Sequence, residues 1–493
     1  MKSDSSQPQT AKNAPPRRMA VIGGGLTGLS AAYYLQKLEP RIDVELYEAT
    51  ARLGGVAGTV HRDGFLIESS ADCFLATESA PWARELIEEI GVSDELISTN
   101  DSCRRALVLW RDRLEPVPQG FRLMGTASME HVWSSPLLSW RGKLRLAAER
   151  LVAPRRDGQD ESLAEFATRR VGREAYQRIV QPLVSGIYSA DPQQLSVAAA
   201  LPQFAAMERR FGSLAIGLRA TESDAGKDAA GARYSMFAAP RRGMQSLVEQ
   251  LAGKLDRCQL NLQQPVKTLR AGHDGRWHVR TDKSVAPQAY DGVVLATDAK
   301  TSARLLREVH DELAGHLSDI EYAGVAVVSC GLERNQIGHS LAGFGFVVPM
   351  IEKRRILATS FSSVKFAKRA PEGKVLLRTF VGGAGQEAMV DWTDAELQQT
   401  VLAELRGILR IQGEPLFWTI NRWPKRTPQY TIGHLKRVES IRNCVGQLSC
   451  LELAGNYFNG VGIPQCVREG RDAAARLQKK AYPRVKGQAF WTA

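Results

Sequence analysis

The sequence predicts an α/β chain, α+β overall, and three observations support that prediction. Short apolar runs with strand character lie near both ends, at residues 19–22 and 451–456, and each leads through glycines into a helical pattern. Helical periodicity dominates residues 82–207. From residue 324 to residue 379, β-rich runs separated by Gly and Pro predict a largely antiparallel sheet.

The first apolar run ends in a glycine motif that turns directly into a helix. Gly23-x-Gly25-x-x-Gly28 stands between the strand 19–22 and the helix-compatible run 29–35. Gly23 permits a tight turn, Gly25 lets the backbone approach a pyrophosphate, and Gly28 lets helix and strand pack closely. In this context the motif predicts dinucleotide binding, with the diphosphate facing the N–H groups of the helix start.

A second strand, residues 44–47, ends at Glu48. A carboxylate there can accept hydrogen bonds from both ribose hydroxyls of an adenosine and would repel a 2′-phosphate. Arg52 and the pair Gly54-Gly55 follow closely, so a second backbone segment can close on the cofactor while Arg52 balances diphosphate charge. These residues favour FAD over NAD, and an ordinary β-turn at the glycine pair is the alternative.

The last strand pattern, residues 451–456, is followed by a glycine-rich turn at 460–464 and a helix to about Lys480. This repeats the N-terminal order of strand, turn and helix, so the end of the chain is expected to return to the nucleotide domain. The residues expected to contact FAD come from all these turns. They are Gly23, Gly24, Gly25, Leu26, Thr27, Gly28, Glu48, Ala49, Arg52, Gly54, Gly55, Val56, Val266, Gly455, Val461, Gly462 and Ile463.

At 493 residues the chain is too long for a single core. We therefore expect a Rossmann-like FAD domain assembled from discontinuous segments, a mixed or antiparallel substrate sheet and a helical region that associates with a membrane. The expected parts are a disordered leader at 1–17, the FAD domain at 18–80, 236–300 and 440–482, the helical region at 81–210 and the sheet domain at 301–439. Polar residues 220–233 predict an exposed loop.

Composition narrows the class of protein. An apolar content of 44% is ordinary for a globular protein, and no run approaches the ~18 apolar residues of a spanning helix. The net charge of +12 favours an anionic partner, but the basic residues are dispersed and no aromatic-interleaved patch indicates nucleic acid. Seven cysteines without a C-x-x-C pair suit a reducing compartment and argue against a zinc site. We expect a cytoplasmic protein without a metal; the histidines without ligand spacing are His61, His131, His278, His339 and His434.

Three further segments carry more specific motifs than the glycine turns. They are QPLVSGIYSADP at 181–192, PQYTIGH at 428–434 and GNYFNGVGIP at 455–464. With these segments, residues 18–480 resemble the oxygen-dependent protoporphyrinogen oxidase family, which includes the coproporphyrinogen III oxidases. Two departures stand out: the run Ser69 to Phe74 replaces a Gly-Pro pair usual in the family, and Gln465 stands where Asp is common.

The resemblance implies FAD-dependent oxidation of a porphyrinogen to a porphyrin in haem biosynthesis. The substrate is protoporphyrinogen IX or coproporphyrinogen III, with O2 as acceptor and H2O2 as by-product. Because the cofactor performs this chemistry, no catalytic dyad is expected in the protein. Two other readings stay open: another flavin enzyme of the amine oxidase or carotenoid desaturase type, and a non-catalytic binding module of the same architecture. The choice of porphyrinogen and a homodimeric state also stay open.

Substrate contacts are expected at four positions. Arg105, with Arg104 as its alternate, resembles a family arginine and can pair with a propionate, although a solvated charge explains it equally well. Gly186 allows close approach to the macrocycle, and Tyr188 and Phe344 supply aromatic faces unless they are core residues. The segment 133–151 mixes aromatic, apolar and basic residues, which suits a helix at an anionic membrane surface on the cytoplasmic side. A domain-packing helix is the alternative.

Overall fold

The computed structural model describes residues 16–221 and 237–482. The expected leader and the expected loop at 220–233 therefore lie almost wholly outside the described residues. Arg17, which we placed in the leader, is instead the first residue of a strand, where it pairs with Ile42. Helices and sheets alternate through the described chain, so the prediction of a mixed α/β fold is confirmed.

A five-stranded parallel sheet is built from segments that are far apart in the sequence. Across the sheet the strands are β12 (Cys258–Asn261), β2 (Ile42–Tyr47), β1 (Arg17–Ile22), β16 (Gly292–Leu295) and β22 (Leu451–Leu453). Every neighbouring pair is parallel. The strands predicted at 19–22 and 44–47 are confirmed, and β22 confirms that the end of the chain returns to this sheet.

Both faces of this sheet are covered, which explains why its strands are apolar runs. On one face lie α1 (Leu26–Leu38), α2 (Trp82–Glu89), α11 (Met244–Ala252) and α17 (Ile463–Ala481). On the other lie α12 (Ala299–Leu306), α13 (Asp311–Ser318), α16 (His434–Gln447) and the small sheet of β13 (Val266–Ala271), β14 (Trp277–Thr281) and β15 (Gln288–Tyr290). Along β1, Met19 and Val21 face the first layer, and Ala20 and Ile22 face the second.

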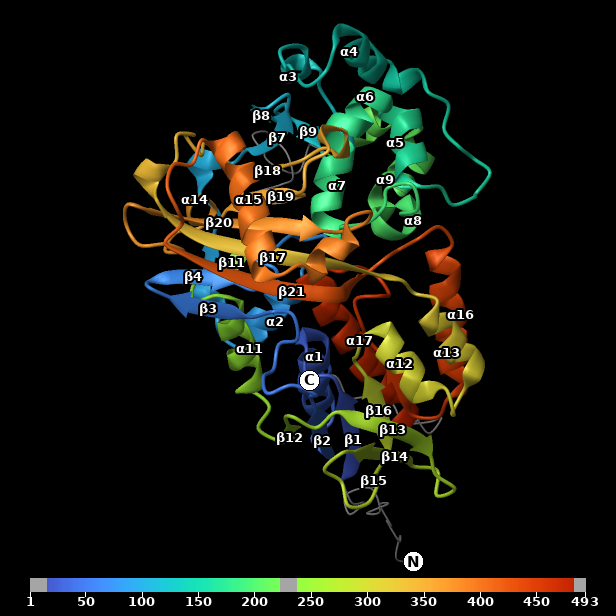
Figure 1. Cartoon of the computed structure of the whole chain (residues 1–493). Helices are drawn as coiled ribbons and strands as arrows, with labels where there is room; N and C mark the ends of the chain where they lie inside the picture. The colour runs from blue at the N-terminus through green and yellow to red at the C-terminus, as the bar shows by residue number, and fades with distance from the viewer. Residues whose placement is uncertain (1–15, 222–236, 483–493) are drawn as a thin grey trace, which may run out of the picture.

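A seven-stranded sheet crosses the middle of the molecule (Figure 1). In spatial order it contains β21 (Phe417–Pro428), β17 (Tyr322–Glu333), β20 (Lys374–Gly382), β19 (Ala358–Phe361), β18 (Gly345–Val347), β7 (Ala106–Trp110) and β8 (Arg113–Pro116). All pairs are antiparallel except β18 with β7, so the largely antiparallel sheet is confirmed. Helix α15 (Asp394–Leu409) shares its core, and α14 (Ser362–Lys365) follows β19.

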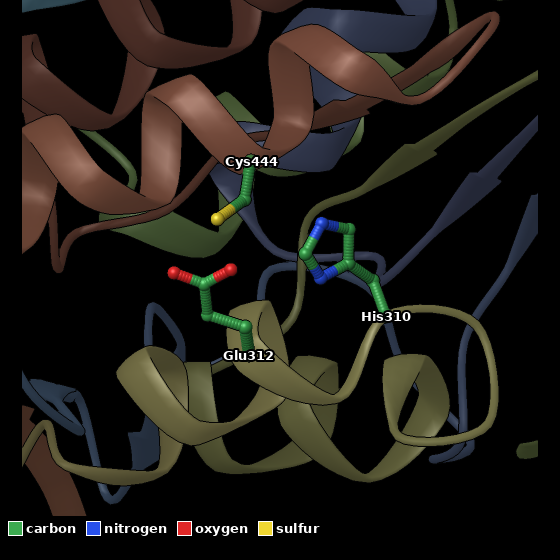
Figure 2. A group of neighbouring side chains, drawn as sticks. All are labelled: His310, Glu312 and Cys444. Carbon is green, nitrogen blue, oxygen red and sulfur yellow. The ribbon is translucent and has the colours of Figure 1, made fainter.

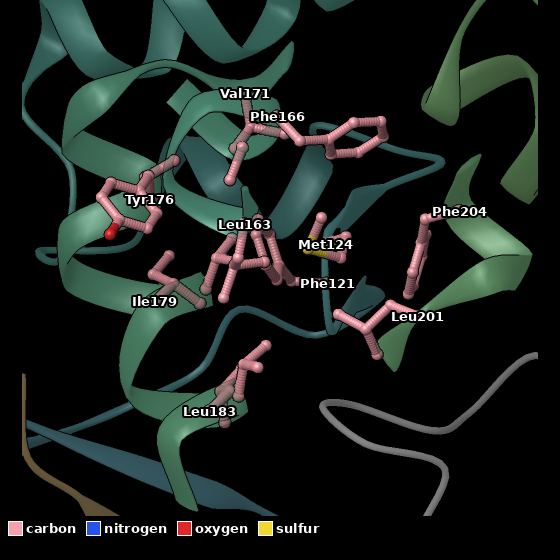
Figure 3. Close-up of a cluster of buried hydrophobic side chains, with 14 of the residues drawn as sticks. Phe121, Met124, Leu163, Phe166, Val171, Tyr176, Ile179, Leu183, Leu201 and Phe204 are labelled. Atoms are coloured by element: carbon pink, nitrogen blue, oxygen red, sulfur yellow. The ribbon is translucent and has the colours of Figure 1, made fainter. Parts of the chain in front are cut away.

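Three small sheets complete the strand inventory of the described residues outside the sheets given above. They are β3 (Thr59–Arg62) with β4 (Phe65–Glu68), the set β5 (Phe74–Leu75), β11 (Phe237–Pro240) and β6 (Leu96–Ser98), and β9 (Phe121–Arg122) with β10 (Gly125–Thr126). The β9–β10 hairpin places Phe121 and Met124 in the core of the helical region (Figure 3). The loops and hairpins therefore join the three parts of the molecule through buried contacts.

The helical region lies at the end of the molecule away from the parallel sheet (Figure 1). Its helices are α3 (Glu130–Trp133), α4 (Trp140–Ala147), α5 (Leu163–Val171), α6 (Arg173–Ala175), α7 (Gln181–Tyr188), α8 (Val197–Ala200), α9 (Pro202–Phe211) and α10 (Leu214–Ala220). A π-helical turn at Tyr176–Val180 joins α6 to α7. Pro182 explains it, because proline has no N–H and its ring crowds the carbonyl four residues earlier.

The single helix expected across 133–151 is wrong. The structure has α3, then a break, then α4, which begins after Ser139, and a 3₁₀ turn at Ala148–Leu151. The hydroxyl of Ser139 accepts a hydrogen bond from the Gly142 N–H, so Ser139 caps α4. Pro136 in the break cannot continue a helix from α3. Among the described helices, none is long and apolar enough to cross a membrane.

Candidate functional site

The first glycine turn has the geometry that only glycine allows. Gly23 has φ +113°, and a Cβ there would lie 2.5 Å from the Ala296 carbonyl oxygen. A Cβ on Gly28 would lie 1.9 Å from the Gly23 carbonyl oxygen, so helix α1 meets its own turn without room for a side chain. Gly25 is the N-cap of α1, and no side chain caps the helix there. The first N–H groups of α1 are therefore left for a ligand.

The second glycine turn lies directly against the first. The Gly54 N–H donates to the Gly24 carbonyl at 2.8 Å, and Gly25 and Gly54 form a parallel bridge. A Cβ built on Gly25 would meet only the Cα of Gly55, at 4.0 Å, so this face of the turn opens onto free space. The two turns thus form a backbone cradle that fits a diphosphate next to a helix start.

Glu48 joins the acidic strand end to the first turn. Its Oε2 accepts the Gly24 N–H at 2.8 Å, and its Oε1 accepts the N–H and the hydroxyl of Thr50, both at 2.8 Å. A carboxylate offers about four acceptor positions, so one more hydrogen bond can be added. The contact with Gly24 was not predicted, because sequence spacing gives no side-chain direction. Ala49 is exposed beside it.

Arg52 and Val266 belong to segments that border this cradle. Arg52 donates to the carbonyls of Ala57 at 2.7 Å and Gly55 at 2.6 Å, so it braces its own loop instead of extending into the cradle. Val266 is buried at the start of β13. The Gln264 N–H donates to the Glu48 carbonyl at 2.9 Å, which keeps the start of β13 near the acidic strand end. Val56 is exposed at 39%.

The C-terminal turn ends in a second uncapped helix start. Gly462 is the N-cap of α17 and receives no side-chain cap, and Ile463 and Pro464 open the helix. A Cβ on Gly470 would lie 2.3 Å from the Thr27 carbonyl oxygen, so α17 packs tightly on α1. Val461 contacts the core of the helical region. The expected FAD residues at the two ends of the chain are therefore brought together by two packed helices.

The three segments with specific motifs meet at Tyr430. Its hydroxyl donates to the Asn456 carbonyl and accepts the Gly460 N–H at 2.8 Å. Its ring centroid lies 6.2 Å from that of Tyr188. Residues of 181–192, 428–434 and 455–464 are therefore in contact at one place, where the helical region meets the parallel sheet.

The expected substrate residues divide into two groups. The Phe344 N–H donates to the Arg105 carbonyl at 2.8 Å, and a Cβ on Gly186 would lie 3.6 Å from Val347 of β18. Arg105 and Phe344 thus lie together at the start of the β18–β7 pair, and Gly186 lies near the other end of β18. Tyr188 does not join them: its ring is in the helical core and its hydroxyl donates to the Ala200 carbonyl at 2.6 Å. For Tyr188 the core-packing alternative fits the structure.

The two candidate arginines differ in their partners. Arg104 forms an ion pair with Asp101, three residues earlier. Arg105 has an exposed side chain, and within residues 16–221 and 237–482 no ion pair holds its guanidinium. Arg105 is therefore the one of the pair that is available to an anionic ligand.

A buried ionic cluster occupies the departure at 69–74, and sequence reasoning missed it. Asp72 contacts the ammonium of Lys365 at 3.0 Å and the guanidinium of Arg378 at 3.3 Å. Burial would raise the pKa of Asp72, but Lys365 and Arg378 outweigh it and lower that pKa. Burial raises the pKa of the neighbouring Cys73 thiol to about 12. Asp72 lies about three hundred positions from Lys365 and Arg378 in the sequence, so a single sequence gives no indication that these charges pair.

Glu68, just before this cluster, is a buried carboxyl group. It accepts the Thr59 hydroxyl at 2.7 Å and the Met244 N–H at 3.0 Å. Burial raises its pKa to about 7, although the Thr59 hydrogen bond and the charge of Arg378 act against that shift. Glu68 therefore titrates near neutral pH.

A separate group of side chains has metal-binding chemistry (Figure 2). His310, Glu312 and Cys444 offer ligand atoms within 4.8 Å of one another, between α13 and α16. However, the Nδ1 of His310 accepts the Leu313 N–H at 3.3 Å, so a neutral ring carries its proton on Nε2 and has no free lone pair. A ligating histidine normally donates from its second nitrogen. The arrangement is that of a helix N-cap.

Together, the parallel sheet, the doubled glycine cradle and the acidic strand end define a dinucleotide-binding protein of the flavoprotein class. The sequence comparison agrees: the family described as flavin containing amine oxidoreductase matches residues 26–478, and this chain belongs to that family. It is a flavoprotein oxidoreductase with FAD as its cofactor. The backbone cradle described above fits that group.

Similar proteins cover nearly the whole chain. A coproporphyrinogen III oxidase from Bacillus subtilis is 32% identical over 466 residues, 93% of this chain and 97% of that protein. A chloroplastic protoporphyrinogen oxidase from Nicotiana tabacum is 28% identical, covering 93% of this chain and 84% of that protein. A crystal structure from Exiguobacterium sp. 255-15, provisionally assigned as a protoporphyrinogen oxidase, has a TM-score of 0.83 at 31% identity, with 94% and 98% of the chains covered.

Proposed function

We propose that this chain is an FAD-dependent oxidase that converts a porphyrinogen to the porphyrin in haem biosynthesis. The observation that carries the proposal is the similarity along more than nine-tenths of the chain to coproporphyrinogen III and protoporphyrinogen oxidases. The contact of segments 181–192, 428–434 and 455–464 at one place supports it, because these segments carry the resemblance. The proposed electron acceptor is O2, with H2O2 as by-product.

In this proposal the chain's own residues bind and orient the cofactor. The N–H groups at the start of α1 and the backbone of Gly25, Gly54 and Gly55 hold the diphosphate, and Glu48 accepts a ribose hydroxyl. The turn before α17 would supply further backbone contacts to the cofactor, because α17 packs on α1. The chemistry that the cofactor would supply when bound is acceptance of a hydride from a meso carbon of the macrocycle.

In this proposal the substrate contacts come from the two ends of the β18–β7 pair. Arg105 pairs with a propionate, since its guanidinium is exposed and its neighbour Arg104 is already paired. Gly186 lets helix α7 approach the macrocycle, and the buried Phe344 supports the backbone next to Arg105. The seven-stranded sheet with the helical region forms the substrate side, and the parallel sheet with its helices forms the FAD domain.

Anaerobic mixing followed by aeration tests the function. Protoporphyrinogen IX and coproporphyrinogen III are added separately while the flavin absorbance near ~450 nm is followed. We expect one of the two to bleach the flavin, and aeration to restore the colour and produce porphyrin fluorescence and peroxide. Protein stripped of FAD is the control. Bleaching by a primary amine, with no response to either porphyrinogen, would contradict the proposal.

We also propose that the α3–α4 end binds an anionic membrane surface on the cytoplasmic side. Trp140, Leu144 and Leu151 are exposed at 65%, 52% and 87%, and Trp133 at 49%. The Arg141 guanidinium lies over the Trp140 ring, 5.2 Å from its centroid. Exposed aromatic and aliphatic side chains beside a cation suit the boundary between headgroups and acyl chains. A homodimer stays a prediction, which sedimentation of the purified protein tests.

A further inference from the structure

Tyr430 connects the helical region to the glycine-rich turn that precedes α17. The side chain is fully buried. Its hydroxyl accepts the Gly460 N–H at 2.8 Å and donates to the Asn456 carbonyl, so both ends of the turn depend on one phenol oxygen. The backbone carbonyl of Tyr430 accepts the Ser196 N–H at 2.8 Å.

The ring of Tyr430 is fixed on both sides. His434 stacks on it with a centroid distance of 4.3 Å and an interplanar angle of 14°. Burial lowers the pKa of His434 to about 4, so this ring is neutral at physiological pH and acts as an aromatic neighbour. Tyr188, the last residue of α7, lies on Tyr430 at 6.2 Å, and the Gln429 side chain donates to the Tyr188 carbonyl at 3.5 Å.

The turn has two further anchors among the described residues: the Asn459 amide donates to the Glu469 carboxylate, and the rings of Tyr457 and Phe458 are buried in the neighbouring core. Gly460 has φ +131°, and a Cβ there would lie 2.6 Å from the Gln465 side chain. No side chain caps α17 at Gly462. Because glycine-rich backbone has high conformational freedom, each anchor reduces the number of shapes open to the turn, and the Tyr430 hydroxyl is the anchor that also links the turn to the helical region.

We propose that Tyr430 is a positioning residue: its hydroxyl holds the 455–462 turn in the shape that binds FAD and ties that turn to the C-terminal end of α7. Removal of the hydroxyl leaves the part-buried Gly460 N–H and Asn456 carbonyl without this partner, which disfavours the bound shape of the turn. The inference rests on FAD as the cofactor and is independent of which substrate is oxidised.

Tyr430→Phe and Tyr188→Phe test the proposal as a matched pair. Both remove one phenol oxygen from a buried ring in the same cluster, but the Tyr188 hydroxyl bonds to Ala200, within the helical region. For Tyr430→Phe we expect the FAD dissociation constant to rise about tenfold and the reduction potential of bound flavin to shift. For Tyr188→Phe both quantities should match the unsubstituted protein. Equal FAD affinity and potential in all three proteins, or an equal loss in both variants, would overturn the proposal.

Hydrogen exchange in the unsubstituted protein tests the same link without a substitution. Amides of 455–462 and of 185–200 are compared in the holoprotein and after removal of FAD. If Tyr430 ties the two segments together, both should exchange faster once FAD is removed. A change confined to 455–462 would show that the turn responds alone, and would overturn the proposal even if Tyr430→Phe fails to fold.

Discussion

Arg104 and Arg105 immediately precede β7 and have different surroundings, so we expect different roles for them. Arg104 is paired with Asp101, whereas Arg105 is exposed and its carbonyl accepts the Phe344 N–H at the start of the β18–β7 pair. A propionate contact lies away from the bond that breaks, so its loss acts mainly on binding. We therefore expect Arg105, and not Arg104, to contribute to substrate binding.

Replacement of Arg105 by Ala should raise the KM for the porphyrinogen about tenfold, with little change in kcat, because one charge-assisted contact is lost in both ground and transition states. Steady-state kinetics measure the two constants. Arg104→Ala is the matched control and should leave KM within about twofold. Equal effects of the two substitutions would remove Arg105 from the substrate site.

Glu68 predicts a pH dependence of stability. Burial raises its folded pKa to about 7 from the usual 4.5, so the folded protein keeps a proton that the unfolded chain has already lost between those values. Folding then binds a proton in this window, and stability falls as the pH rises from about 4.5 to about 7.

Glu68→Gln should flatten that fall, since the amide carries no titrating proton. The contribution is about 3 kcal/mol across the window. Melting temperatures of both proteins at several pH values between 5 and 7.5 measure the difference in slope. Parallel profiles would contradict a raised pKa at Glu68. Thr59→Val, which removes one hydrogen bond to the carboxylate, should raise the pKa further and steepen the fall.

At the level of elements, the packing of α1 on its glycine turn decides whether the cradle forms. A Cβ on Gly28 would enter the Gly23 carbonyl, and backbone atoms cannot move aside as a flexible side chain can. Gly28→Ala should destabilise the protein by at least ~1–3 kcal/mol and abolish FAD binding, as measured by the flavin content of purified protein. Gly446→Ala in α16 is the control, because a Cβ there meets nothing within 4 Å. Retained flavin in Gly28→Ala would contradict the close packing.

Elements with a local signal were predictable and those without one were not. Strands 19–22 and 44–47 and the glycine turns follow from apolar runs and backbone freedom, which are properties of neighbouring residues. The break at Pro136 was visible in the sequence and was overlooked in favour of amphipathic composition. The cluster around Asp72 and the bonds of Tyr430 join residues hundreds of positions apart, so no local pattern predicts them.

For the whole molecule, α3 and α4 lie at the end farthest from the small sheet β13–β15 (Figure 1). A membrane bound there would contact the helical region and leave the parallel sheet in solvent. Binding through this end would fix the orientation of the protein on the membrane. We expect the apolar side chains of Trp140 and Leu151 to contribute more to this binding than charged side chains do.

Trp140→Ala combined with Leu151→Ser should reduce co-sedimentation with vesicles containing anionic phospholipid at least fivefold, because exposed apolar area drives insertion at the interface. Arg141→Glu should weaken binding less and in a salt-dependent way. Leu38 at the end of α1 and Leu260 in β12 are exposed at the parallel sheet, and their replacement by Ser supplies a control for general loss of apolar area. Unchanged sedimentation of the double variant would exclude this end as the binding surface.

The parallel sheet takes its central strand from residues 17–22 and its last edge strand from 451–453, and α17 closes on α1. During synthesis the ribosome must therefore release residues as far as 481 before β22 and α17 can complete the FAD-binding part of the fold. Pairing of strands that are far apart in the sequence is slow, so we expect nascent chains to expose apolar strand faces until α17 has been synthesised. Nonsense codons near the 3′ end of the coding region should consequently yield colourless, chaperone-bound products even though the first glycine motif is intact.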